Sequence, residues 1–117
     1  MITPTEIVQQ HLMQVVDVDV VSKVPADRPS LFVRVDTGAP QPETKVSYLT
    51  TVIVQVYGVD LEQVIDLIDT CRHALESIDA RDDVYWWDET SGPYEFPDPD
   101  LSEVHRWQLV GQLTHHM

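Results

Sequence analysis

The side chains that could act as nucleophiles are few and lie apart. Cys71 and His73 are two positions apart in a helix-like pattern, so their side chains diverge and form no nucleophile–base pair. Cys71 also falls on the apolar side of that pattern, which predicts a buried structural thiol. We therefore expect no enzymatic activity from this chain.

Metal-ligand and phosphate-binding patterns are also missing. The histidines have neither zinc-motif nor H-E-x-x-H spacing: His11, His73, His105, His115 and His116. The pairs Asp17/Asp19 and Asp98/Asp100 lack the glycine and final glutamate of a calcium loop, and suit turns and helix caps better. The four glycines are scattered and form no phosphate loop. We expect no cofactor and no metal.

The charge balance narrows the choice of partners. The chain has 117 residues, with 7 Lys+Arg against 20 Asp+Glu and a net charge of -13. This length fits one domain, residues 1–117, and the 43% hydrophobic content suffices for one core without disulfides. The negative charge repels nucleic-acid backbones and anionic membranes. It suits a basic partner, high solubility, or a channel through which DNA slides.

The first half of the chain predicts a helix followed by a hairpin. Thr3, Pro4 and Glu6 form a capping box before a helix that ends near Val15. A short strand or extended link follows over residues 17–21, and strands are expected over 31–36 and 46–57. The loop between these two strands, residues 37–44, is rich in Gly and Pro. We expect an antiparallel hairpin with a mobile tip.

The second half predicts one strong helix and further strands. An apolar stripe with three- and four-residue spacing indicates a helix over residues 61–78. Strands are expected over 84–87 and 104–114, with a turn at 89–93 and an extended piece at 94–96. The fold class is therefore α+β: an antiparallel or mixed sheet of about four or five strands with two main helices packed on it.

Aromatic residues gather in the last third of the chain. Trp86 and Trp87 are adjacent on an expected strand, so they face opposite ways and at least one could lie outside the core. Tryptophan is enriched at the centres of protein interfaces. The alternative is that helices cover both faces of the sheet and bury both side chains.

In this order, these features resemble the tail terminator proteins of long-tailed bacteriophages, particularly those of actinobacterial hosts. A short helix precedes residues 24–29, which lead into the strand 31–35. A long strand, 52–57, runs into the helix that ends at residues 72–75. The segments 89–93 and 97–99 precede the last strand, 105–110. The resemblance covers nearly the whole chain, although the acidic run 17–19 and residues 85–87 depart from it.

The resemblance implies an assembly function. Such proteins form a hexameric ring on the finished tail tube, stop its polymerisation and offer a docking surface to the head–tail connector, or neck. The expected partners are therefore further copies of the chain, the tail-tube protein and the neck protein. DNA would pass through the ring without specific binding. The expected location is the virion tail, after assembly in the cytoplasm of the bacterial host, and no signal peptide or membrane span is expected.

Candidate contact residues follow from exposure and charge. The hairpin tip, with Gly38, Pro40 and Pro42, could reach a neighbouring subunit or the tube. Arg28, Arg34 and Arg106 are scarce cations that could pair with carboxylates across a subunit interface, or could form local surface ion pairs. Trp86 is the aromatic candidate for the interface.

Two other kinds of function remain open at this point. A head-completion protein, a neck protein or another minor tail component would share the size and the ring-forming habit. A small-ligand or regulatory binding domain would need a concave pocket with convergent polar groups. An enzyme is disfavoured because no catalytic constellation is present.

Overall fold

The N-terminal helix is defined by its cap. In the computed structural model, which describes residues 1–117, α1 spans Pro4–Met13. The backbone N–H of Glu6 donates to Thr3 Oγ1 at 3.2 Å, and the backbone N–H of Thr3 donates to Glu6 Oε1 at 3.2 Å. This confirms the predicted capping box. After α1, the chain forms the two-residue strand β1, Val20–Val21.

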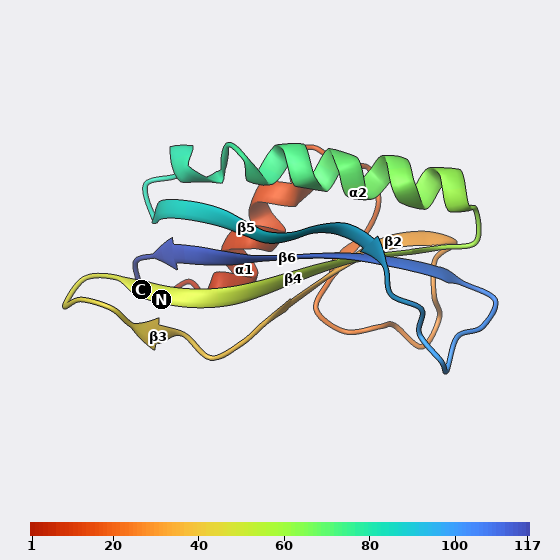
Figure 1. The fold of residues 1–117 in the computed structure, drawn as a ribbon, viewed down its shortest axis with the longest axis horizontal. Coiled ribbons are helices and arrows are strands. Elements are labelled where there is room, and N and C mark those ends of the chain that lie inside the picture. Colours follow the sequence, from red (N-terminus) through yellow and green to blue (C-terminus); the bar gives the residue numbers. More distant parts are fainter.

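The predicted hairpin is present and antiparallel. Strand β2, Leu31–Thr37, pairs with β4, Tyr48–Gly58, over its whole length. The connecting loop contains β3, Gln41–Pro42, which pairs with the start of β4. In Figure 1 this loop extends beyond the sheet beside the start of β4.

The main helix is α2, Leu61–Leu75, which begins after the N-cap Asp60. The Asp60 side chain accepts a hydrogen bond from the Gln63 backbone N–H at 3.2 Å. The helix ends three residues earlier than the predicted Ile78, because a 3₁₀ turn, η1, occupies Ile78–Ala80. Ser77 Oγ donates to the Ala74 carbonyl at this transition, which satisfies one carbonyl at the helix end.

The last two strands form a long antiparallel pair. Strand β5 spans Val84–Glu95 and β6 spans His105–His115. The predicted turn at residues 89–93 is wrong, because β5 continues through Gly92 and Pro93. Of the three register shifts against β6, the one between Ser91 and Tyr94 accommodates these residues. Since β5 is an edge strand, proline is tolerated there when its missing N–H faces away from the neighbouring strand.

The sheet has six strands and is mixed. Its order is β1-β2-β4-β6-β5, with β3 also pairing with β4. The β1–β2 pair is parallel and the others are antiparallel. The expected four or five strands were therefore approximately right, and the α+β class with two helices packed on the sheet is confirmed.

One face of the sheet carries both helices and the core. Val35, Val54 and Leu109 lie side by side on β2, β4 and β6, and all three are fully buried. They form one cluster with Ile7 and Leu12 of α1 and the apolar side of α2. Figure 1 shows α2 lying along the sheet, with α1 crossing beside it. The opposite face carries no helix.

Candidate functional site

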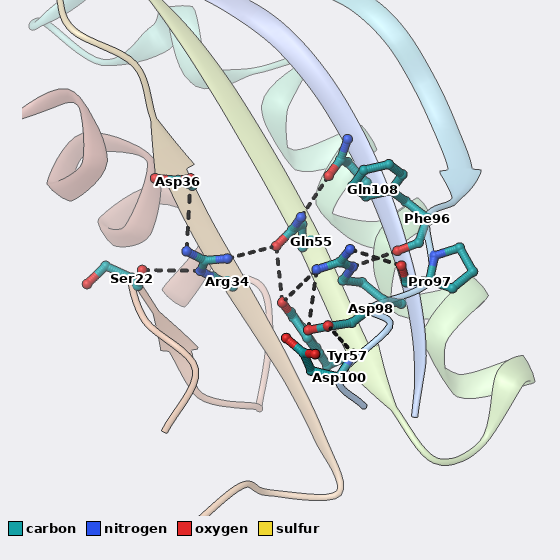
Figure 2. Close-up of polar contacts among 11 residues, drawn as sticks. Ser22, Arg34, Asp36, Gln55, Tyr57, Phe96, Pro97, Asp98, Asp100 and Gln108 are labelled. Carbon is teal, nitrogen blue, oxygen red and sulfur yellow. Dashed lines mark hydrogen bonds and ion pairs between the residues drawn. The ribbon is translucent and has the colours of Figure 1, made fainter. Parts of the chain in front are cut away.

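A row of polar side chains crosses the helix-free face. Gln55 of β4 donates to Gln108 Oε1 of β6 at 2.7 Å and accepts from Arg34 Nη1 of β2 at 3.3 Å. Gln108 in turn donates to the Tyr94 hydroxyl of β5. Figure 2 shows Gln55 between Arg34 and Gln108. Both glutamines are 6% exposed. The hydrogen bonds of this row join four strands and therefore help to fix the register between them.

Arg106 connects residues 96–98 to the sheet. Its guanidinium donates to the Phe96 carbonyl at 2.6 Å and the Pro97 carbonyl at 3.2 Å, and lies 3.6 Å from Asp98 Oδ2. It also lies 4.9 Å from the Phe96 ring centroid. Figure 2 draws the hydrogen bonds and the ion pair as dashed lines to Phe96, Pro97 and Asp98. Together these contacts hold residues 96–98 beside the strand that carries Arg106.

Arg106 also contacts an aromatic pair below it. The Tyr57 hydroxyl accepts from Arg106 Nη1 at 3.3 Å, and the Tyr57 ring stacks on Phe32 at 4.7 Å. Tyr57 and Phe32 are each 1% exposed. This cluster could not be predicted from the sequence, because it depends on the register between β2, β4 and β6.

The rest of the helix-free face is open. We call this part the open face; its side chains come from the start of β4 and the end of β6 and are half-buried: Leu49, Thr51, Ile53, Val110, Gln112 and Thr114. Trp86 pairs with Thr114 at the border of this patch and is 61% exposed. The prediction that one of the adjacent tryptophans lies outside the core is therefore confirmed.

The candidate arginines differ in how they are held. Arg34 donates to the Ser22 carbonyl and lies 4.0 Å from Asp36, so it has local partners like Arg106. Arg28 is exposed and makes no ion pair or hydrogen bond. It lines a hollow with Asp100 and Glu103. An interface role stays a prediction for all three. Of the three guanidinium groups, that of Arg28 has the fewest contacts within the chain.

The hairpin-tip candidates lie together on the protruding loop. Gly38 and Pro42 are exposed and Pro40 is half-buried. Behind them the loop is closed by Thr44 Oγ1, which accepts from the Ser47 backbone N–H at 3.1 Å. We call residues 38–47 the arm. It includes Val46, which lies just before the start of β4 and is 64% exposed.

A concave site lies between the end of α2 and β5. This hollow of about 260 Å³ is lined by Arg72, Glu76, Asp79, Trp86, Trp87 and Glu89. Arg72 Nε donates to both carboxylate oxygens of Glu89, at 3.1 and 3.3 Å. Asp79 has no ion-pair partner, and Glu76 has only His73, at 3.8 Å. The hollow thus has surplus negative charge beside Trp87, which packs toward the core, with the exposed Trp86 at its rim.

Cys71 and His115 carry reactive side chains, but both are buried within the fold. Cys71 is fully buried, and burial raises the pKa of its thiol to about 12, so it is protonated at neutral pH. His115 is also buried and is held between Thr50 Oγ1 and the His116 carbonyl, each at 2.7 Å. No three metal-ligating side chains come together. No helix combines the length and the apolar character needed to cross a membrane.

Comparison with known proteins adds no family. The sequence matches no protein-family model and no curated protein.

Proposed function

We propose that this protein is a tail terminator of a long-tailed bacteriophage. It forms a hexameric ring that caps the finished tail tube, stops tube polymerisation and joins the tail to the neck. It acts in the virion tail after assembly in the bacterial cytoplasm. The observation that carries the proposal is the helix-free face: apolar and amide side chains remain open there beside the exposed Trp86. Aromatic and apolar patches of this kind mark protein-binding surfaces.

The arrangement of surfaces suits a closed ring. A cyclic ring needs two different patches on each subunit, because each contact joins unlike faces. The open face lies on the sheet, and the arm projects from the start of β4, so one subunit could offer its arm to a neighbour's open face. Partners in this assembly are further copies of the chain, the tail-tube protein and the neck protein.

The charge of the chain suits the passage of DNA. With 20 acidic against 7 basic residues, a ring of six copies surrounds its centre with negative charge. Repulsion of the phosphate backbone lets DNA pass without adhering. DNA is therefore a transient neighbour of the ring rather than a specifically bound ligand.

The direct test is to add the purified protein to polymerising tail-tube subunits of the same phage and image the products by electron microscopy. The proposal expects tubes that stop growing and carry a ring at one end. Tubes of unchanged length without a cap would reject the terminator function. The same protein would then be mixed with the isolated head connector, where binding would favour a neck protein.

A further inference from the structure

We propose that the hollow between α2 and β5 is a docking site for an arginine side chain of a basic partner protein. We name it the α2–β5 hollow, with the lining residues given above. The inference stands independently of the ring, because it rests on the chemistry of this one surface.

The size of the hollow favours a single side chain. At about 260 Å³ it is slightly below the roughly 300–1,000 Å³ of sites that enclose small molecules. It is open at the outer edge of the sheet, where β5 has no further strand beside it. A partner segment that runs past this edge can insert one side chain while the rest stays outside.

The lining selects a planar cation. Asp79 and Glu76 are exposed carboxylates with no lysine or arginine partner, and Trp87 lies with them in the hollow, with the exposed Trp86 at the rim. Indole rings attract cations, and guanidinium stacks on them more favourably than ammonium does. Guanidinium can also donate two parallel hydrogen bonds to one carboxylate. Arginine therefore satisfies both features at once.

The site is largely preformed. The Trp87 ring lies against Gly111 of β6, where any side chain would collide with it, so this indole is fixed in place. Arg72 already pairs with Glu89, which neutralises that carboxylate and leaves Glu76 and Asp79 for a guest. A preformed site loses little conformational entropy on binding.

The chain's own arginines are poor candidates for the guest. Four of them make ion pairs within the chain: Arg34, Arg72, Arg81 and Arg106. The fifth, Arg28, lines a different hollow with Asp100 and Glu103. Charge complementarity therefore favours a different protein whose docking segment is basic.

The test uses two short peptides and the full chain. Acetyl-Gly-Arg-Gly-amide is titrated into the protein while the three indole N–H signals are followed by NMR. The matched control peptide carries citrulline, which has the shape of arginine without its charge. We expect saturable shifts of the Trp86 and Trp87 signals with the arginine peptide. The Trp107 signal serves as an internal reference.

Variants then identify the carboxylates. The double substitution Glu76→Gln with Asp79→Asn should weaken binding of the arginine peptide about three- to tenfold, as expected for the loss of two exposed ion pairs. The control Glu62→Gln with Asp66→Asn neutralises two exposed acids elsewhere on α2 and should leave the affinity unchanged. All four residues are exposed, so every variant is expected to fold.

Three results with the peptides would overturn the inference. They are equal shifts with the citrulline peptide, shifts that never saturate, and unchanged affinity in the Glu76/Asp79 variant. Sedimentation of the wild-type protein and the Glu76/Asp79 variant tests whether a second copy of the chain occupies the hollow. An oligomer that dissociates when Glu76 and Asp79 are neutralised would mean that it does. That result would overturn the assignment to a different protein.

Discussion

Arg106 shows how a scarce cation is used inside an acidic chain. Its side chain is 11% exposed. It contacts the backbone carbonyls of Phe96 and Pro97, the Asp98 carboxylate and the Tyr57 hydroxyl. Replacing it with leucine would leave these acceptors without their donor. We expect Arg106→Leu to lower the free energy of unfolding by about 1–3 kcal/mol, measured by urea denaturation.

The control for Arg106 is Arg28→Leu. Arg28 is exposed and makes no hydrogen bond or ion pair, so its replacement should change stability by no more than about 0.5 kcal/mol. An equal loss in both variants would mean that residues 96–98 are not held by the Arg106 contacts.

Cys71 provides a second measurement on a single residue. Its thiol is fully buried, and its pKa is raised to about 12, so roughly one molecule in ten thousand carries the thiolate at pH 8. We expect an aromatic disulfide reagent to label it at pH 8 only after unfolding in urea, as followed by absorbance. Rapid labelling of the folded protein would show that α2 opens readily.

The Arg81–Asp83 pair makes stability depend on pH. Arg81 donates hydrogen bonds to Asp83 at 2.8 and 2.9 Å, and this holds the pKa of the Asp83 carboxyl below its ordinary value. The folded-state pKa is thus the lower one, so the stabilisation is present above about pH 4 and is lost as the pH falls through the folded-state value.

Asp83→Asn should therefore reduce stability at pH 6 by less than about 1 kcal/mol, and the difference from wild type should shrink toward pH 2. The neighbouring Asp82 is exposed and makes no hydrogen bond or ion pair, so Asp82→Asn is the matched control. Thermal unfolding at a series of pH values measures both. A difference that persists at pH 2 would contradict the mechanism.

At the scale of the elements, β5 and β6 are joined by an aromatic ring over a glycine. The Trp87 side chain occupies the space that a Cβ at Gly111 would need. We expect Gly111→Ala to displace the ring and lower stability by about 1–3 kcal/mol, measured by urea denaturation. Gly92 of β5 is the control: a Cβ there would meet Glu89 Oε2 only at ordinary contact distance, 3.9 Å, so Gly92→Ala should have a much smaller effect.

Some elements of this fold could be predicted from the sequence, and others, including the full length of β5, could not. The helix α2 was predictable because its apolar stripe has helical spacing and Asp60 supplies a cap. The continuation of β5 through Gly92 and Pro93 was not, because these residues favour turns locally. They are tolerated there because β5 is an edge strand with register shifts, and strand order cannot be obtained from a local pattern.

At the scale of the whole molecule, the candidate surfaces required the topology. Strand alternation predicted that the two adjacent tryptophans face opposite ways, but burial of both by helices on two faces stayed open until the topology placed both helices on one face. The Arg34–Gln55–Gln108–Tyr94 row was not, because its members come from four strands whose register is set by long-range pairing. The α2–β5 hollow likewise combines a helix end with an edge strand.

The arm is the part of the molecule on which assembly can be tested without disturbing the fold. It contributes no residue to the buried core cluster, and β3 pairs with β4 through only Gln41 and Pro42. Removing Ala39–Thr44 and closing the gap with two glycines should therefore leave thermal stability close to that of wild type. If the arm contacts a neighbour or the tube, the shortened protein should fail to cap growing tubes.

Capping by the shortened protein is measured by electron microscopy of tail tubes, with circular dichroism to confirm that it folds. The full-length Glu62→Gln variant, which retains the arm and changes an exposed residue of α2, shows whether a change at a distant surface alone abolishes capping. Normal capping by the folded, shortened protein would exclude the arm from assembly. The open face and Trp86 would then remain as one of the two patches that a ring needs, and the second patch would lie outside the arm.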